Sequence, residues 1–163
     1  MSFETSYSCT YLNMRKFLTI IILIFSTQLA HSQECNLNPE RGSKNYIIGY
    51  GSLMDKDSRT RTNKSAFVVK PILIKGFERT WGLSGGMYKI TFLTIIKKEN
   101  SVVNAVYYPV SIKDLNKTDR RESGYCRVKV EGKDLSFYGK KIKTKNKNFW
   151  VYAANPGKIK KPS

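Results

Sequence analysis

Short runs of β-branched and aromatic residues recur along the chain from Tyr46 onward, and Gly, Asn, Pro or Lys separates them. Such side chains pack well on a pleated surface, so these runs predict β-strands. The polar pair Asn100-Ser101 lies between two of the runs and predicts a hairpin turn. The predicted strands are Tyr46–Tyr50, Phe67–Ile74, Phe77–Trp81, Thr91–Ile96, Val102–Tyr108, Tyr125–Val130 and Phe149–Ala153.

One segment has the features of a helix instead. Ser111 is followed three residues later by Asp114, which resembles a capping box and predicts a helix over Ile112–Arg121. A second helical turn is predicted near Asp55–Arg61. A mostly β pattern with one or two flanking helices predicts an α+β fold built on a small mixed or antiparallel β-barrel.

The N-terminal region has the organisation of a secretory signal peptide. Arg15 and Lys16 follow Met14, Phe17–Phe25 forms a short apolar core, and Ala30–Ser32 offers a small-residue cleavage site. The apolar run is shorter than a spanning helix, although a short anchor or a buried helix is the alternative. We expect a secreted or periplasmic protein with no stable membrane anchor after cleavage.

These features divide the chain into four parts. Residues 1–13 lack a charged region of their own and are interpreted as a non-native upstream extension before Met14. Residues 14–32 form the signal peptide, and the polar residues 33–45 form a linker. Residues 46–163 form the folded domain, which fits the length of a single domain.

Three cysteines are present, at Cys9, Cys35 and Cys126. Signal cleavage removes Cys9, and the other two could pair in an oxidising compartment. Cys126 alternates in phase with Val128 and Val130, which favours a small apolar side chain in the core. The sequence leaves open whether Cys35 and Cys126 pair.

The composition is that of a globular protein, but the formal net charge is +17. Such a charge favours acidic partners such as nucleic acid or anionic small molecules. A lysine-rich solvated surface explains it more simply, because most lysines are spread along the chain. We therefore expect no nucleic-acid partner. The exception to this spread is a lysine-rich tail formed by Lys140, Lys141, Lys143, Lys145 and Lys147.

The only histidine, His31, lies in the predicted signal peptide, so the mature domain has none. This removes the Ser-His-Asp and Cys-His arrangements and the commonest metal ligand. From Tyr46 onward the chain has nine carboxylates. Acid–base chemistry must fall to one of these, a Lys, a Tyr or Cys126, and we expect no metal site.

Glu122 is the strongest of these candidates. It follows the predicted helix and precedes a glycine and a strand, at an element edge where a side chain can face a pocket. The neighbouring Arg120, Arg121 and Arg127 would lower its pKa, whereas partial burial would raise it. An ordinary ion pair at a helix end is the alternative interpretation.

The turn Tyr50-Gly51-Ser52-Leu53 is the second candidate. A glycine after a buried strand permits a close turn or a positive φ, which exposes successive N–H groups. Such groups bind carboxylates and oxyanions, and Ser52 could donate a further hydrogen bond. A plain strand-ending turn is the alternative.

In order and spacing, the two segments resemble the gamma-glutamylcyclotransferase-like family, which includes the AIG2-like proteins. The family shares a first strand ending in Y-G-S-L or Y-G-S-N and a later D-x-x-E…G-Y stretch, matched by Tyr50–Leu53 and by Asp119–Glu122 with Gly124 and Tyr125. Between them, PILIKGFERTWGL and NAVYYPVSIKDLNKTDRRE resemble a Gly-x-x-Arg strand and a Val-Tyr-x-Val…Leu…Asp-x-x-Glu run of the family. The resemblance covers about residues 46–153.

The resemblance implies a small β-barrel and an enzyme that needs no cofactor or metal. The implied reaction cyclises a γ-glutamyl group to 5-oxoproline and releases an amine or amino acid, as a C–N lyase or acyltransferase would. A small γ-glutamyl molecule is then the partner, and Glu122 is the catalytic acid/base. The residues implied in substrate binding are Gly49, Tyr50, Gly51, Ser52, Leu53 and Tyr125.

Family members continue beyond the equivalent of Trp150–Ala153 into a Pro-containing segment with a further Tyr. Because this chain ends at Ser163, we expect the domain to be truncated at its C-terminus. A non-catalytic module that binds a small anion through the 50–53 turn is the alternative function. The leaving group and the oligomeric state are not specified by the sequence.

Overall fold

The structure is a computed structural model that describes residues 35–85, 90–155 and 159. The chain divides into two units, Met1–Gln33 and Glu34–Ser163. The expected upstream extension and signal peptide therefore lie outside the described residues. Within the described part, no helix is both long and apolar enough to span a bilayer.

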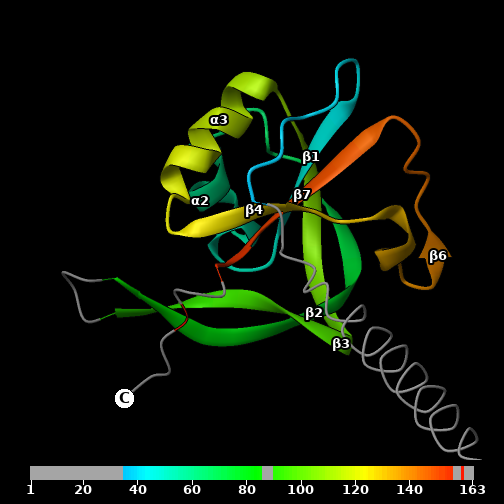
Figure 1. The fold of residues 1–163 in the computed structure, drawn as a ribbon. Coiled ribbons are helices and arrows are strands. Elements are labelled where there is room, and N and C mark those ends of the chain that lie inside the picture. The colour runs from blue at the N-terminus through cyan, green and yellow to red at the C-terminus, as the bar shows by residue number, and fades with distance from the viewer. Residues whose placement is uncertain (1–34, 86–89, 156–158, 160–163) are drawn as a thin grey trace, which may run out of the picture. The chain divides into compact units, whose positions relative to one another are not determined.

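The second unit is a curled, mixed seven-stranded sheet with two α-helices beside it (Figure 1). The strand order is β4-β7-β1-β3-β2-β5-β6, and β1 pairs in parallel with β7 and antiparallel with β3. This confirms the predicted α+β class. In chain order the elements are β1 (Lys44–Gly49), η1 (Ser52–Met54), α2 (Lys56–Thr60), β2 (Lys70–Gly85), β3 (Ile90–Val110), α3 (Ile112–Arg121), β4 (Tyr125–Lys129), η2 (Gly132–Asp134), β5 (Leu135–Phe137), β6 (Lys140–Lys141) and β7 (Lys147–Ala154).

Two long strands replace four predicted short ones, and the hairpin turn at Asn100-Ser101 is wrong. The register of β2 with β3 passes from Lys75 opposite Val102 to Phe77 opposite Lys97, so residues 98–101 bulge opposite Gly76. Asn100 has φ 60° and Gly76 has φ 77°. Residues that favour positive φ serve bulges as well as turns, which is why the local signal misled.

The helix α3 matches its predicted bounds, Ile112–Arg121. Its first turn is capped as expected, because the Asp114 N–H donates to Ser111 Oγ at 3.1 Å. Leu115 and Thr118 are buried, whereas Ile112 is half exposed. The buried face of α3 therefore anchors the helix against the core. This anchoring fixes the position of its C-terminal end, and Glu122 is the next residue.

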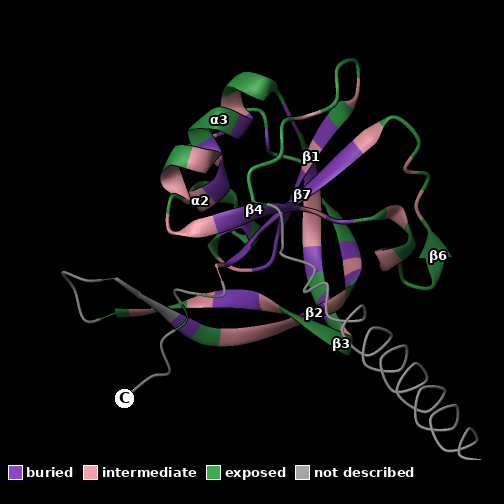
Figure 2. Ribbon diagram, viewed as in Figure 1, coloured by how far each residue is buried: buried purple, intermediate pink, exposed green. Residues whose placement is uncertain are grey.

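The two faces of β1 and β7 are covered by different clusters. Ile48 and Val151 belong to the core inside the curl of the sheet, whereas Ile47 and Trp150 belong to a second core that also holds Leu115 of α3. Side chains of a strand point alternately to its two faces, and here a core covers each face. The strands β1 and β7 are therefore the most deeply buried ones. Figure 2 shows this as purple ribbon along both strands, with green on the outer side of α3.

The segment predicted as a linker is attached to the sheet in its described part. Cys35 forms a disulfide with Cys126 of β4. The Asn36 N–H donates to the Arg127 carbonyl at 2.9 Å. Cys126 is 2% exposed, so it lies in the core as its pattern suggested, but its sulfur is bonded rather than free.

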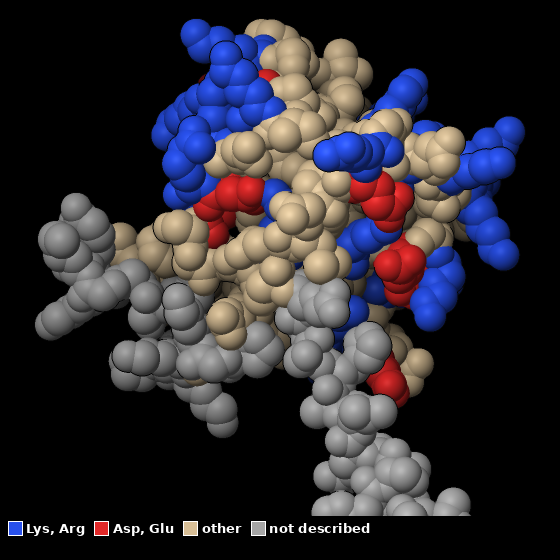
Figure 3. Space-filling model, turned by 45° about the horizontal axis from the view of Figure 1, so that its top comes forward, with Lys and Arg blue, Asp and Glu red and all other residues tan. Residues whose placement is uncertain are grey.

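The lysine-rich stretch is not a tail, because it spans the edge strand β6, the connection that holds Lys143 and Lys145, and the start of β7. Lys140 and Lys141 form the edge strand β6, and Lys147 begins β7. In the view of Figure 3, Lys and Arg side chains occupy several separate areas with Asp and Glu between them. On this face of the molecule, the charge is distributed as expected for a solvated surface.

The disulfide generates a stability prediction. Its cysteines are 91 residues apart in sequence, and cross-linking a loop of that length stabilises by about 3–5 kcal/mol. We expect Cys35→Ser to lower the free energy of unfolding by about this amount in urea titrations. Wild type in a thiol reductant should fall to the same value, whereas Cys35→Ser should not respond; equal stability of all three would contradict the prediction.

Candidate functional site

Glu122 follows the last residue of α3 and starts the turn into β4. Its N–H donates to the Thr118 carbonyl at 2.8 Å, and its own carbonyl accepts from the Tyr125 N–H at 2.8 Å. Its side chain is only 14% exposed, and Oε1 lies 3.2 Å from Arg121 Nε. The carboxyl group is therefore held near the C-terminal end of α3 with limited access to water.

Burial raises the pKa of Glu122 above its usual value, and the charge of Arg121 opposes this shift without cancelling it. Of the arginines expected around it, Arg127 instead pairs with Asp119. The direction left open by the sequence is thus decided by burial. A raised pKa suits a carboxyl group that must both accept and return a proton.

Four tyrosines interact electrostatically with Glu122. Burial raises the pKa of Tyr50, Tyr108, Tyr125 and Tyr152, and the negative charge of Glu122 raises each further. They come from the end of β1, from β3, from β4 and from β7. The candidate site is thus a carboxyl group among phenol side chains that stay protonated at neutral pH.

The tyrosine hydroxyls also connect the site to its frame. Tyr50 Oη donates to the Tyr152 carbonyl at 2.6 Å, and Tyr125 Oη donates to the Leu93 carbonyl at 3.0 Å. Tyr152 Oη donates to Asp119 Oδ1 at 2.7 Å. Tyr108 and Tyr152 were not among the predicted site residues, because only the strand pairing brings them to Glu122.

The 50–53 turn runs directly into the short helix η1. The Met54 N–H donates to the Gly51 carbonyl at 2.9 Å, so the N–H groups of Ser52 and Leu53 precede the first bonded amide of this helix. Gly51 has φ −127° rather than a positive value. Leu53 is buried and Ser52 exposed, so the turn offers backbone N–H groups and one hydroxyl.

The close approach in this turn occurs at Gly49. A Cβ on Gly49 would lie 2.8 Å from Leu53 Cβ and 2.9 Å from the Leu53 backbone. A Cβ on Gly51 would meet only Leu93 Cδ2, at 3.6 Å. The glycine that the fold requires is therefore the last residue of β1, one position before the tyrosine of the Y-G-S-L motif.

Arg121 joins the turn to the end of α3. Its Nη2 donates to Ser58 Oγ at 2.6 Å and lies 3.4 Å from Ser52 Oγ, while Nη1 donates to the Ser58 carbonyl at 2.6 Å. The same guanidinium contacts Glu122. The two sequence segments that were predicted to form one site therefore do meet.

A second arginine contacts the turn through its backbone. Arg79 Nε donates to the Tyr50 carbonyl at 3.3 Å, and its Nη atoms donate to Asn104. Leu93, on the facing strand, lies against Gly51. Arg79 stands in the Gly-x-x-Arg stretch of the sequence, and its contact with the turn follows from the long β2–β3 pairing.

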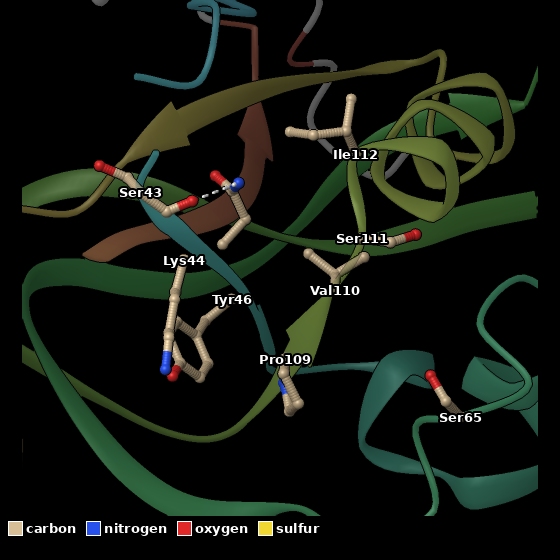
Figure 4. Close-up of a pocket in the computed structure, with 9 residues that line it drawn as sticks. Ser43, Lys44, Tyr46, Ser65, Pro109, Val110, Ser111 and Ile112 are labelled. Carbon is tan, nitrogen blue, oxygen red and sulfur yellow. Dashed lines mark hydrogen bonds between the residues drawn. The ribbon is translucent and has the colours of Figure 1, made fainter. Parts of the chain in front are cut away.

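A hollow of about 420 Å³ lies at a different place. Figure 4 shows its walls, which come from the start of β1, the end of β3, the beginning of α3 and the loop before β2. The ends of β1 and α3 that line it are opposite to those next to the 50–53 turn and Glu122, and no predicted site residue lines it. The lining residues are Ser43, Lys44, Asn45, Tyr46, Ser65, Pro109, Val110, Ser111 and Ile112.

Across residues 35–85, 90–155 and 159, no group of three or more His, Cys, Asp or Glu side chains is arranged to hold a metal ion. The chemistry available around Glu122 is accordingly that of a carboxyl group, a guanidinium, phenols and backbone N–H groups.

A curled α+β sheet that places a buried glutamate beside a strand-ending turn defines the class of fold and site. The family model described as "Gamma-glutamyl cyclotransferase, AIG2-like" matches residues 47–163. The chain belongs to this family. Comparison with curated proteins finds no match.

Solved structures share the fold at low sequence identity. A structure named gamma-glutamyl cyclotransferase is 19% identical, with a TM-score of 0.55, 68% of this chain covered and 66% of that one. An uncharacterized protein from Homo sapiens is 20% identical, with a TM-score of 0.56 and coverages of 69% and 67%. A yeast gamma-glutamyl cyclotransferase specific to glutathione is 17% identical, with a TM-score of 0.52 and 74% of each chain covered. This chain thus spans less than two thirds of the first of these proteins.

The contrast between the two glycines gives a prediction. Gly49→Ala should lower the free energy of unfolding by about 1–3 kcal/mol, because the new methyl group must displace the Leu53 backbone. Gly51→Ala is the matched control and should change stability by less than about 1 kcal/mol, since its Cβ meets an ordinary contact. Urea titration of both variants is the measurement, and equal effects would contradict the assignment.

Glu122 gives a second prediction, on stability against pH. Its folded-state pKa is raised above the unfolded one, so its contribution is fully present below the unfolded pKa and is lost as pH rises through the folded pKa. At pH 7, Glu122→Gln should therefore be at least as stable as wild type, and the difference should shrink on acidification. Thermal unfolding of both proteins from pH 7 down to acidic pH is the measurement. A variant clearly less stable than wild type at pH 7 would contradict a raised pKa of Glu122.

Proposed function

We propose that this protein is a gamma-glutamyl cyclotransferase that converts a γ-glutamyl amide into 5-oxoproline and a free amine or amino acid. The observation that carries the proposal is the buried Glu122 carboxyl group, with its raised pKa, joined through Arg121 to the 50–53 turn. Membership of the family supports the reaction type. The similar structure named gamma-glutamyl cyclotransferase supports it through the fold.

In the proposed mechanism, Glu122 moves one proton. Ionised Glu122 takes a proton from the α-ammonium group of the substrate, and the freed amine attacks the γ-carbonyl carbon. A C–N bond forms and closes the five-membered ring, and the bond to the leaving nitrogen breaks. Glu122 returns this proton to that nitrogen and is ionised again. The ring nitrogen still carries one proton more than the lactam product, and this second proton passes to the released amine, which leaves as its ammonium form.

The charge that develops on the γ-carbonyl oxygen needs hydrogen-bond donors. The N–H groups of Ser52 and Leu53 have no acceptor within η1, and we assign the substrate contacts to them and to the neighbouring Gly49–Gly51 backbone. Tyr125, with its pKa raised to about 12, stays protonated at neutral pH, and its hydroxyl would have to leave the Leu93 carbonyl to donate to this oxygen. Donors fixed in place before the reaction stabilise such a charge without reorganisation cost.

The rest of the rate enhancement is assigned to conformation. Nucleophile and electrophile belong to one molecule, so the enzyme has only to hold the folded substrate conformer. Arg79 and Arg121 contact the turn at Tyr50 and Ser52, and we assign the restraint of this turn to them. A site of this kind needs no covalent intermediate.

We also propose that the enzyme works outside the cytosol, in a secreted or periplasmic location. The predicted signal peptide over residues 14–32 motivates this, and the Cys35–Cys126 disulfide supports it, because disulfides persist in oxidising compartments. The substrates would then be γ-glutamyl compounds of that compartment.

The test is 5-oxoproline release from a panel of γ-glutamyl amino acids and γ-glutamyl amines. Glu122→Gln should lower kcat by about 10²–10⁴-fold, the usual contribution of a general acid–base. Glu78→Gln is the matched control, because Glu78 is an exposed glutamate paired with Lys98, and it should keep wild-type rates. Folded wild type that binds γ-glutamyl compounds without turnover would instead indicate the non-catalytic binding module.

The pH dependence follows from the same carboxyl group. Glu122 must be ionised in the free enzyme, so kcat/KM should fall as pH drops through its pKa. Because burial raises that pKa, the acid limb should lie above the ordinary value of 4.5. A limb at or below 4.5, measured from pH 3 to 8, would contradict the assignment of Glu122 as base.

A further inference from the structure

Arg127 of β4 is a buried cation, and its contacts converge on the end of α3. Its side chain is 5% exposed, its guanidinium lies 4.9 Å from the centre of the Trp150 ring, and it forms an ion pair with Asp119. Asp119 precedes Glu122 by three residues and lies in the last turn of α3. The pair therefore ties the part of the helix that carries Glu122 to the sheet.

Asp119 has a second partner on the sheet. Tyr152 Oη of β7 donates to Asp119 Oδ1 at 2.7 Å, while Arg127 holds Oδ2. The carboxylate is thus clamped between two strands. Because the Glu122 N–H is bonded to the Thr118 carbonyl in the same turn, the backbone of Glu122 follows the placement of Asp119.

The other side of Arg127 is covered by residues 35–40, which we name the N-terminal strap. The Leu37 carbonyl accepts from Arg127 Nη2 at 2.7 Å, and Asn36 is hydrogen-bonded to both the N–H and the carbonyl of Arg127. Glu40 pairs with Lys129 at the far end of the strap. The Cys35–Cys126 disulfide fixes its near end to β4.

The N-terminal strap therefore helps to stabilise the buried charge of Arg127 in its ion pair with Asp119. Arg127 Nε is buried without a hydrogen-bond partner, so the guanidinium depends on Asp119 and Leu37 for compensation of its burial. A buried charge that loses a partner is costly, and an ion pair opened to water is weaker. Release of the strap would remove the Leu37 carbonyl from Arg127 and would also expose the ion pair with Asp119 to water.

We propose that Arg127 is a positioning residue for Glu122, and that the disulfide-held N-terminal strap makes this positioning depend on oxidation. The inference rests on the proposed function for its kinetic consequence. A dithiol reductant supplies two electrons and two protons, which convert the Cys35–Cys126 disulfide into two thiols while the reductant becomes a disulfide. The strap then leaves β4, Arg127 becomes hydrated and the last turn of α3 loosens.

Loosening changes the surroundings of Glu122 in a predictable direction. Arg121 of α3 contacts the Glu122 carboxylate, and the charge of this carboxylate interacts with Tyr50 after β1, Tyr108 of β3, Tyr125 of β4 and Tyr152 of β7. Burial among these groups is what raises the pKa of Glu122. Entry of water reduces that burial, so the acid limb of kcat/KM moves to lower pH.

The kinetic experiment compares Arg127→Met with Lys129→Met. Methionine keeps the apolar contact with Trp150 but removes the charge next to Asp119, and we expect a fall of about tenfold in kcat, equivalent to about 1.4 kcal/mol, with a nearly constant KM. Lys129→Met breaks only the Glu40 contact, while the disulfide still holds the strap, and should leave both values unchanged. Equal kinetics for a folded Arg127→Met variant would overturn the proposal.

The single variant Arg127→Met could fail to fold, because it leaves the charge of Asp119 uncompensated. The double variant Asp119→Asn/Arg127→Met avoids this, because it removes both charges of the ion pair. Reduction of the wild type provides the matching test without substitution. At a temperature where circular dichroism shows the protein folded, reductant should lower kcat to a similar extent. Because reduction leaves the charge of Arg127 in place, it should also move the acid limb to lower pH. Cys35→Ser should show both from the start and ignore the reductant. Unchanged kinetics after complete reduction would overturn the proposal.

An exchange measurement separates this inference from the proposed function. Reduction should speed hydrogen exchange of the amides of 118–122, while those of β1 stay protected. If the wild type releases no 5-oxoproline from any γ-glutamyl compound, the proposed function fails, and the exchange result alone decides the inference. Faster exchange at 118–122 would support the strap, and unchanged exchange there would overturn it.

Discussion

The burial of β1 between β7 and β3 is the constraint on which the rest of the structure depends. Its residues alternate between a core inside the curled sheet and a second core beneath α3, so the strand can neither slip nor rotate. The chain must then leave β1 at Gly49, where the Leu53 backbone closes over a position without a side chain. The turn therefore stands at one fixed place, and α3, packed through Leu115 on the second core, ends beside it.

The local parts of this arrangement were readable from the sequence. The cap at Ser111 and the buried Leu115 define α3, because helix bounds depend on neighbouring residues. The merging of four predicted strands into two was not readable, since Gly76 and Asn100 carry the same local signal in a bulge as in a turn. The disulfide was left open for a related reason: a separation of 91 residues says nothing about proximity.

In the candidate site too, some residues could be predicted from the sequence and others only from the fold. Glu122 and the 50–53 turn were selected as candidates from their residue types, by excluding histidine and by their order in the chain. Tyr108 and Tyr152 were not, because they reach Glu122 only through the pairing of β1 with β3 and β7. The direction of the pKa of Glu122 also needed the fold, since neighbouring arginines in the sequence and actual burial act in opposite senses. Despite the strongly positive chain, burial dominates at this carboxyl group.

The two edges of the sheet are protected by different means, and this has a consequence for the solution behaviour of the protein. At one edge, β6 is two lysines long, and such charged short strands resist pairing with another molecule. At the other edge, the backbone of Arg127 in β4 is occupied by Asn36. The strap therefore also conceals a strand edge. A reduced molecule would present that edge to its neighbours, so loss of one covalent bond would turn a self-contained sheet into a template for intermolecular β-pairing.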